Sequence, residues 1–504
     1  MGSGKKIVKG VVWTTIYNIV NAVYGFISVP ILIGYFGKAE YGLIGLAMSV
    51  NVYMRLMDMG ADATNVRFFS YWMAKDDRES LRRGFSTSLS FYTIVGLLNA
   101  LILLGVALFS DSIFNVSPEQ CIILRQLFYV LMISAVVNWF SSCLNQLVRA
   151  TENVAWLQMM QLVPKIAQIV ILVLTVCLKF GIVTYFLLTS LAIVLLIPLL
   201  VFKIKKEVPD VSFVPKMYVP VLKELLPYCL NIFSFSIFQY SFYNLRPVFL
   251  GIRGTMESVA DFRVLNAIVT VVTMLGGAFL SVLLPSSSRV VAQENRDAYN
   301  KIAYDGTRYI SILICLCCFG MMAVGKELLT LYVGESFLYL LPWLNIWLLC
   351  TLATHNQAIS SLILAGSDIR AITWCSAFSS VIGLVFSWFL IPKFDLGGVV
   401  IAFVVYSVIQ IGFYYIYYWP RKMGINSWRV FSRDFIPFVL AGIAAFFAAV
   451  WPEWTMNRWL LLALKGTIFT ALYGALVLIL LGREGRARIL SDVVKFRGSG
   501  KAEA

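Results

Sequence analysis

Residues 182–202 read IVTYFLLTSLAIVLLIPLLVF, a run of 21 residues without a single charge. A helix needs about 20 apolar residues to cross the roughly 30 Å hydrocarbon core of a bilayer. The next few residues include Lys203, Lys205 and Lys206, and short cytoplasmic loops are enriched in Lys and Arg. This stretch therefore predicts a membrane-spanning helix that ends on the inner side of the membrane.

The composition of the whole chain agrees with that interpretation. Of its 504 residues, 60% are hydrophobic and 13% are charged, whereas soluble domains contain about 45–50% apolar and about 25% charged residues. A chain with this composition cannot be an ordinary soluble protein. The same numbers exclude a disordered, collagen-like, coiled-coil or secreted disulfide-rich chain.

Breaks at charge clusters and at Gly or Pro divide the chain into fourteen apolar segments, which predicts an all-α polytopic membrane protein. The predicted spans lie near residues 10–35, 41–70, 85–109, 121–148, 154–178, 182–202, 224–250, 257–287, 307–325, 338–364, 371–391, 396–418, 434–452 and 459–481. With the N-terminus inside, the inner segments hold 28 of the 41 Lys and Arg residues and the outer loops hold seven. Both termini are therefore predicted to be cytoplasmic. Most of the +15 charge then reflects topology, so no nucleic-acid partner is expected.

The chain repeats itself at a lag of about 215 residues. Leu147–Val154 and Leu362–Ile369 open spans five and eleven, and Gly37–Glu40 matches Gly254–Glu257 before spans two and eight. The repeat predicts two parallel, pseudo-symmetric six-helix lobes, an arrangement that recurs among transporters. The predicted parts are an N-terminal lobe at 1–202, a cytoplasmic linker loop at 203–223, a C-terminal lobe at 224–418, and two appended helices with a basic cytoplasmic tail at 419–504.

Span two carries polar residues at helical spacing. Asn51, Arg55, Asp58 and Asp62 follow one another at steps of four, three and four, which places them on one face of a continuous helix. A charge at mid-span costs about 2.5–3.5 kcal/mol by insertion scales. Two interpretations remain open: Arg55 neutralises Asp58 and holds the lobe together, or the face is a polar cavity wall whose carboxylate responds to a proton or cation.

Two further arginines lie in spans seven and eight. Gln239, Tyr243 and Arg246 share one face of span seven, and Arg263 and Asn266 begin a polar stripe along span eight. Guanidinium groups bind phosphate bidentately and stay protonated. The pair predicts an anion site, with structural pairing as the alternative. Asp261 lies beside the outer end of the stripe, so the candidate ion-coupling residues are Asp58, Asp62 and Asp261.

Two features of the N-terminal lobe could also face a cavity. Tyr17, Asn21 and Tyr24 form an uncharged polar stripe on span one, which suits sugar hydroxyls or, equally, hydrogen bonds between helices. Lys165 follows Pro164 inside span five, where its ammonium group either faces the cavity or reaches toward the inner surface.

Neither metal nor covalent chemistry is expected. Cys315, Cys317 and Cys318 lie within one span with no His or carboxylate nearby, and His355 is the single His of the chain. We interpret the cysteines as packed apolar thiols. No catalytic residue, metal or cofactor is therefore predicted, apart from a coupling ion, H⁺ or Na⁺.

Several stretches of the chain are similar to a known family. The segments Val29–Gly37 and Glu40–Gly45 resemble the first outer turn of polysaccharide-biosynthesis flippases, which belong to the multidrug/oligosaccharidyl-lipid/polysaccharide (MOP) exporter superfamily. Arg55–Gly60 with Asn65–Phe68 resembles the second helix of that family, and Phe262–Asn266 with the later Pro285 resembles its eighth. The resemblance covers all fourteen spans in order.

The resemblance implies two helical lobes that form a V around a cavity opening alternately inward and outward. It also implies flipping of an undecaprenyl-pyrophosphate-linked oligosaccharide, such as an O-antigen or capsule unit, across a bacterial inner membrane. Arg246, Arg263 and Arg55 match the cavity cations. The implied partners are the lipid-linked oligosaccharide, membrane lipids and other polysaccharide-assembly membrane proteins. Related flippases of cell-wall precursors have an Arg in span one, and residues 10–35 here have none, which argues against that cargo.

Two other functions are weighed against the flippase. A cation-coupled multidrug antiporter of the same superfamily is favoured by Asp58 and Asp62 but disfavoured by Arg246 and Arg263. A membrane glycan polymerase or ligase would need sizeable outer loops. Here the longest outer loops are 110–120 and 326–337, and neither contains a His.

Overall fold

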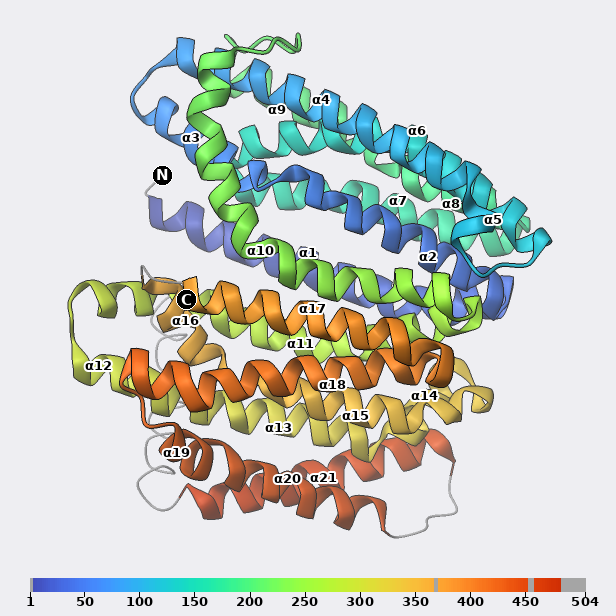
Figure 1. Cartoon of the computed structure of the whole chain (residues 1–504), viewed down its shortest axis with the longest axis vertical. Helices are drawn as coiled ribbons and strands as arrows, with labels where there is room; N and C mark the ends of the chain where they lie inside the picture. Colours follow the sequence, from blue (N-terminus) through green and yellow to red (C-terminus); the bar gives the residue numbers. More distant parts are fainter. Residues whose placement is uncertain (1–2, 367–369, 452–456, 482–504) are drawn as a thin grey trace, which may run out of the picture. The chain divides into compact units, whose positions relative to one another are not determined.

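The computed structural model describes residues 3–366, 370–451 and 457–481, and these ranges contain helices and loops but no strand (Figure 1). Most of the predicted basic tail, from residue 482 onward, lies outside the described residues, as does the end of the repeat segment at 367–369.

The first half of the chain forms nine helices with short connections. They are α1 (Ser3–Phe36), α2 (Lys38–Met54), α3 (Ala61–Ala74), α4 (Arg78–Leu108), α5 (Ser110–Ile113), α6 (Pro118–Ala150), α7 (Val154–Leu178), α8 (Ile182–Leu191) and α9 (Leu196–Glu207). The second half continues with α10 (Val219–Arg253), α11 (Met256–Ala292), α12 (Arg296–Lys301), α13 (Thr307–Ala323), α14 (Gly325–Val333), α15 (Leu341–Thr351), α16 (Gln357–Ala365), α17 (Arg370–Phe394), α18 (Leu396–Phe413), α19 (Ser427–Arg429), α20 (Ile436–Val450) and α21 (Arg458–Leu480).

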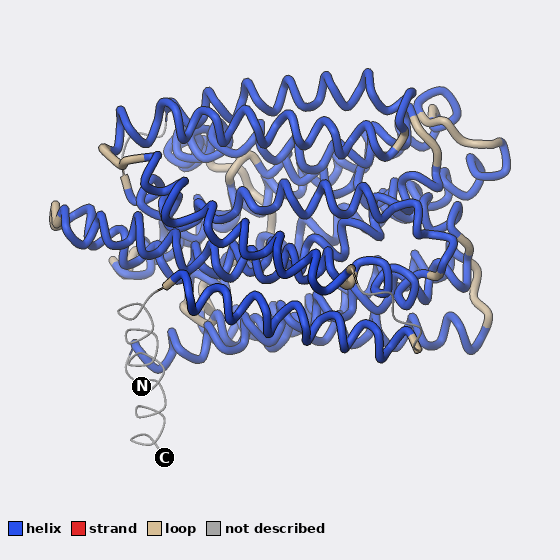
Figure 2. Tube along the Cα trace, turned by 90° about the horizontal axis from the view of Figure 1, so that it is seen from below, coloured by secondary structure: helices blue, strands red, loops and turns tan. Residues whose placement is uncertain are grey.

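Seven further segments have tighter or wider helical turns. The 3₁₀ segments are η1 (Arg55–Asp58), η2 (Ala192–Leu195), η4 (Glu335–Leu340) and η5 (Leu352–Asn356). The π-helical segments are η3 (Ile302–Gly306), η6 (Tyr414–Met423) and η7 (Val430–Phe435). Connecting loops lie mainly at the ends of the long helices (Figure 2).

The helices confirm an all-α, multi-pass membrane protein. Over the described residues, eleven helical stretches are long and apolar enough to cross a membrane. The remaining predicted spans, 41–70, 224–250 and 257–287, correspond to α2–η1–α3, α10 and α11. On α4, Ile94, Leu97, Leu98 and Leu101 are each about half exposed. These residues share one helical face, and such a continuous apolar face is explained by contact with lipid.

The second span differs from the continuous helix that the spacing predicts. α2 ends at Met54, η1 follows, and Met59 and Gly60 adopt left-handed backbone angles (φ 50° and 80°) before α3 begins at Ala61. Only glycine adopts such angles without strain from a Cβ atom. The prediction that Asn51, Arg55, Asp58 and Asp62 share one unbroken face is therefore wrong.

One compact unit consists of Met1–Val264 together with Ser376–Ala402. Within it α4 packs along α6, α1 along α7, and α2 along α10. The buried core contains Phe69, Trp72 and Phe85. A Cβ atom at Gly84 would lie 2.1 Å from the ring of Trp72, so the close packing of α3 on α4 requires glycine there.

The other unit consists of Leu265–Cys375 and Phe403–Ala504. Within it α20 and α21 pack against each other and against α13. Lys465 on α21 forms a buried ion pair with Glu327 on α14, at 2.8 Å. The predicted lobe boundaries at residues 202, 224 and 418 rest on the sequence repeat and stay a prediction.

Candidate functional site

The first polar group inside the membrane-spanning helices surrounds Asp58. Its carboxylate accepts a hydrogen bond from the hydroxyl of Tyr92 and another, at 3.0 Å, from the backbone N–H of Asp62. Arg55 is exposed and forms no ion pair with any residue in the described ranges. The charge of Arg55 nevertheless lies within electrostatic reach of the Asp58 carboxylate, so both interpretations of this face stay open.

A chain of hydrogen bonds extends from Asp58 into the unit. Gln146 Nε2 donates to the hydroxyl of Tyr92 at 2.6 Å and to Asp62 Oδ1 at 3.2 Å. Asn65 Nδ2 donates to Gln146 Oε1, and Ser88 Oγ donates to Asn65 Oδ1, both at 2.9 Å. We refer to Asp58, Asp62, Asn65, Ser88, Tyr92 and Gln146 as the Asp58 network. Because α3, α4 and α6 all contribute to it, it forms only in the folded unit.

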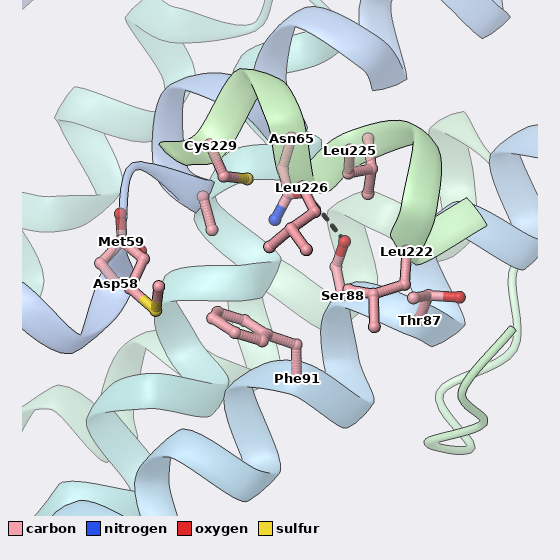
Figure 3. A pocket seen from close by; sticks show the side chains of 11 residues that line it. Asp58, Met59, Asn65, Thr87, Ser88, Phe91, Leu222, Leu225, Leu226 and Cys229 are labelled. Atoms are coloured by element: carbon pink, nitrogen blue, oxygen red, sulfur yellow. Dashed lines mark hydrogen bonds between the residues drawn. The ribbon is translucent and has the colours of Figure 1, made fainter. Parts of the chain in front are cut away.

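A cavity of about 40 Å³ lies against this network (Figure 3). Asp58, Asn65 and Ser88 line it on one side. The α10 residues that close the other side are Leu222, Leu225, Leu226 and Cys229. The volume accommodates a few water molecules. Asp62, by contrast, is held by Arg149 at 3.0 Å.

A second polar group combines lysine, arginine and tyrosine. Lys165 Nζ donates to Gln168 Oε1 at 2.8 Å and lies 4.7 Å from the ring centroid of Tyr24. The hydroxyl of Tyr24 lies 3.4 Å from the hydroxyl of Tyr185. Helices α1, α7 and α8 therefore place an ammonium group beside the ring of Tyr24, whose hydroxyl in turn lies next to that of Tyr185.

Arg263 extends this group from α11. Its aliphatic stem packs against Gly45, and its guanidinium lies 5.9 Å from the ring centroid of Tyr41 and within electrostatic reach of Tyr185. Within the described residues, no carboxylate lies within 4 Å of either Lys165 or Arg263. We refer to Tyr24, Tyr41, Lys165, Tyr185 and Arg263 as the cation–tyrosine cluster. Two half-buried cations among tyrosine side chains suit a ligand that is both anionic and rich in hydroxyl groups.

Three other predicted cavity residues of this unit are Arg55, Tyr17 and Asn21. Arg55 is within electrostatic reach of Tyr17 on α1 and of Tyr240 on α10, whose hydroxyl donates to the carbonyl of Val52 at 2.8 Å. Asn21 is exposed on α1.

Arg246 is buried, with 3% of its surface exposed. Its guanidinium lies 5.2 Å from the ring centroids of both Phe242 and Tyr243 and 5.5 Å from that of Phe262. Gln239 and Tyr243, predicted to share its face, are exposed instead. Arg246 is therefore enclosed by aromatic rings in this structure.

Two more predicted residues lie on α11. Asn266 is exposed, and its backbone carbonyl accepts a hydrogen bond from Thr270. Asp261 is buried and forms an ion pair with Lys38 of α2 at 2.8 Å. The charge of Asp261 is thus balanced within the unit.

Sequence patterns missed Tyr41, Tyr92, Gln146 and Tyr185. Each is a polar residue within an apolar segment, which is a weak signal by itself. Their partners are 34 to 222 residues away in the chain, so no local spacing reveals them.

One family model and several solved structures are similar to this chain. Residues 7–291 match the model of a family described as polysaccharide biosynthesis proteins. No curated protein matches. A solved structure described as the lipid II flippase MurJ in an inward closed conformation is 13% identical; the match covers 94% of this chain and 99% of that one, with a TM-score of 0.74.

Two multidrug transporters show the same likeness. An inward-facing multidrug resistance MATE family transporter of the MOP superfamily is 16% identical, with a TM-score of 0.63 and coverage of 80% of this chain and 96% of that one. The MATE multidrug transporter DinF-BH is 16% identical, with a TM-score of 0.60 and coverage of 83% and 96%. At these identities the likeness to the solved structures concerns the fold.

Proposed function

The chain belongs to the polysaccharide biosynthesis protein family, and from that premise we propose that it flips an undecaprenyl-pyrophosphate-linked oligosaccharide. The cargo is an O-antigen, capsule or similar repeat unit, and it moves from the cytoplasmic to the periplasmic leaflet of a bacterial inner membrane. Transport proceeds by alternating access without a covalent step, and both termini face the cytoplasm. Membrane lipids and other polysaccharide-assembly membrane proteins are its proposed neighbours.

The observation that carries this proposal is the cation–tyrosine cluster. Lys165 and Arg263 have no carboxylate partner within the described residues, although a charge inside a membrane normally faces a partner or a cavity. A pyrophosphate supplies the missing negative charge. The hydroxyls of Tyr24 and Tyr185 are then available to the first sugars, while the lipid tail stays in the bilayer.

The test is leaflet movement of a fluorescent undecaprenyl-pyrophosphate oligosaccharide in liposomes that contain the purified protein. We expect Arg263→Ala to lower the rate by about tenfold or more, because a hydrogen bond to a charged group contributes about 1.5–3 kcal/mol. Arg263→Lys should restore part of the rate, since the charge returns without the bidentate geometry.

Arg125→Ala is the matched control, because Arg125 lies on α6 and pairs with Asp111 away from the cluster. It should leave the rate unchanged. If Arg263→Ala flips the cargo as fast as the unsubstituted protein does, the cluster does not bind pyrophosphate.

We further propose that Asp58 binds the coupling ion, H⁺ or Na⁺. Of the three candidate carboxylates, Asp62 pairs with Arg149 and Asp261 pairs with Lys38, whereas Asp58 is hydrogen-bonded beside the cavity. Asp58→Asn keeps an oxygen acceptor for Tyr92 but removes the charge. The rate should then lose its dependence on pH or sodium while the protein still folds. An unchanged dependence would place the coupling ion on another group. If the unsubstituted protein shows no dependence on pH or sodium, the driving force is the membrane potential acting on the cluster cations, about 2.3 kcal/mol per charge per 100 mV.

A cation-coupled multidrug antiporter is the second candidate, and the cavity beside Asp58 is the observation that favours it. Export of a cationic fluorescent dye that depends on Asp58 but not on Arg263 would support the antiporter over the flippase. Lys165 and Arg263 oppose it, because they repel a cationic cargo.

A further inference from the structure

The turn that connects α18 to α20 is strongly basic. Residues 414–435, the inner turn segment, run through η6, α19 and η7. They carry four exposed cations, which are Arg421, Lys422, Arg429 and Arg433. None of the four is within 4 Å of a carboxylate in the described parts of the chain.

The same segment exposes no acidic group. Its single acid, Asp434, is completely buried and accepts a hydrogen bond from Arg308 Nε at 2.9 Å. Trp428 and Ile416 are 72% and 77% exposed, and Tyr417 is partly exposed beside Arg421. Basic residues together with exposed aromatic side chains are typical of the membrane–water interface.

Contacts with a neighbouring helix hold this turn in one conformation. Arg296 on α12 donates to the carbonyls of Met423 and Gly424 at 3.1 and 3.0 Å. The backbone N–H of Asn426 donates to the hydroxyl of Tyr304 at 3.0 Å, and the guanidinium of Arg429 lies 4.0 Å from the centroid of the same ring. The cations are therefore displayed from a fixed backbone, so a ligand does not have to order the turn.

We propose that the inner turn segment binds the phosphate headgroup of an anionic phospholipid of the phosphatidylglycerol class. The charges match, since the segment offers four cations and no exposed carboxylate. Basic pockets between membrane helices on the cytoplasmic side are suited to such headgroups. The exposed rings of Trp428 and Tyr417 would lie beside the glycerol and upper acyl region. This binding is independent of the cargo.

The test measures lipid binding to the full-length protein in detergent by native mass spectrometry. The variant Arg421→Gln/Lys422→Gln/Arg429→Gln/Arg433→Gln should bind phosphatidylglycerol on the order of several hundredfold more weakly, because each Lys or Arg near an anionic headgroup contributes about fivefold. Arg421→Gln/Lys422→Gln alone leaves the Arg429–Tyr304 contact in place and should weaken binding about tenfold or more. Phosphatidylcholine should bind equally to all forms.

The matched control changes four exposed cations elsewhere on the predicted inner surface, Arg82, Lys205, Lys206 and Lys223, to Gln. It should bind phosphatidylglycerol as the unsubstituted protein does. An equal loss in the control, or no loss in either variant, overturns the proposal. Displacement of the lipid by inorganic pyrophosphate at similar concentration would assign the segment to soluble phosphates. If the fourfold variant binds phosphatidylglycerol normally but no longer moves the oligosaccharide, the inner turn segment contacts the cargo instead of the lipid.

Discussion

Individual charges within these helices fall into two kinds. Lys38 with Asp261 and Arg149 with Asp62 are ion pairs inside one compact unit. Lys165 hydrogen-bonds to a neutral amide instead. A charge without a counter-ion in a membrane helix is costly, so its presence indicates a role beyond stability.

Lys165→Met tests this distinction. The side chain keeps its length and loses its charge, so the unfolding temperature should stay the same or rise, since an uncompensated half-buried ammonium is removed. Oligosaccharide movement should fall several-fold, because the cluster loses one of two cations. Thermal unfolding in detergent and the liposome assay measure the two effects. If the unfolding temperature and the rate of oligosaccharide movement both fall, Lys165 has a structural role.

Arg246 is expected to behave in the opposite way. Its guanidinium is enclosed by Phe242, Tyr243 and Phe262, and a desolvated cation–π contact contributes about 2 kcal/mol. Arg246→Met should therefore lower the unfolding temperature, whereas Arg263→Met should leave it nearly unchanged. Equal unfolding temperatures for the two variants would show that the aromatic enclosure adds no stability. A direct contact of Arg246 with pyrophosphate stays a prediction. Such a contact requires the surrounding aromatic rings to move away from the guanidinium.

At the scale of the helices, the sequence predicts best the membrane-spanning segments, because the thickness of the bilayer sets their length. Fourteen apolar segments correspond to helices because each is about as long as the membrane is thick. The break after Met54 was missed because Arg55 and Asp58 fit a helical spacing so well, although Gly60 was a visible signal for a left-handed turn. Spacing assumes an unbroken helix, and it cannot show which tertiary contacts replace the lost turn.

The loop predicted as a joint between lobes is docked rather than free. Ser86 Oγ donates to the carbonyl of Val214 at 2.9 Å, the N–H of Tyr218 donates to Thr87 Oγ1 at 3.2 Å, and Phe213 packs edge-on against Phe85. Phe213→Ala should speed trypsin cleavage near Lys216, because the ring, partly buried against Phe85, anchors the loop. Asp210→Ala should change it little, since the Arg78–Asp210 pair is exposed and such pairs contribute about 0–1 kcal/mol. If Asp210→Ala is cleaved faster than Phe213→Ala, the Arg78–Asp210 ion pair anchors the loop.

A buried ion pair holds α21, the last of the described helices. Lys465 and Glu327 are 8% and 4% exposed, and removing one partner from such a pair costs about 3–5 kcal/mol. Lys465→Met should therefore strongly lower the unfolding temperature, and adding Glu327→Gln should recover much of the loss. If the single and double variants unfold at the same temperature, the pair is not coupled. Lys165→Met is the control, because it removes a lysine without leaving an unpaired carboxylate and should not lower the unfolding temperature.

Over the whole molecule, the sequence predicted which charged residues lie within membrane spans. It did not predict which of them are in contact with one another. Lys165, Tyr24 and Arg263 were all candidates, yet their connection runs through Tyr185 and Tyr41, which no pattern selects. Asp261 shows the converse. Its place beside the Arg263 stripe suggested ion coupling, but the ammonium group that balances it comes from α2, 223 residues away. Long-range pairing of this kind follows from helix packing and not from spacing along one helix.

Alternating access requires that contacts at one end of the helices break during the cycle, and one set is well placed to do so. At the end predicted to be outside, Lys38 pairs with Asp261 and the side chain of Asn115 donates to the carbonyl of Gly254 at 2.9 Å. Nearby, α2 and α11 are so close that a Cβ atom at Gly42 would lie 2.0 Å from the carbonyl oxygen of Met256. These contacts hold α2 and α11 together at the end predicted to be outside.

Lys38→Asp should place two carboxylates together and open that end, because like charges in a partly buried site repel strongly. We expect faster labelling of Tyr41→Cys by a membrane-impermeant maleimide, measured against the background of the native cysteines, since Tyr41 is 4% exposed in the closed arrangement. The reversed pair Lys38→Asp/Asp261→Lys restores the attraction and should restore slow labelling of Tyr41→Cys. In the chain that keeps Tyr41, the reversed pair should also restore transport. If the reversed pair labels as fast as Lys38→Asp alone, the ion pair does not hold the outer end closed, and the close approach at Gly42 must account for the closure.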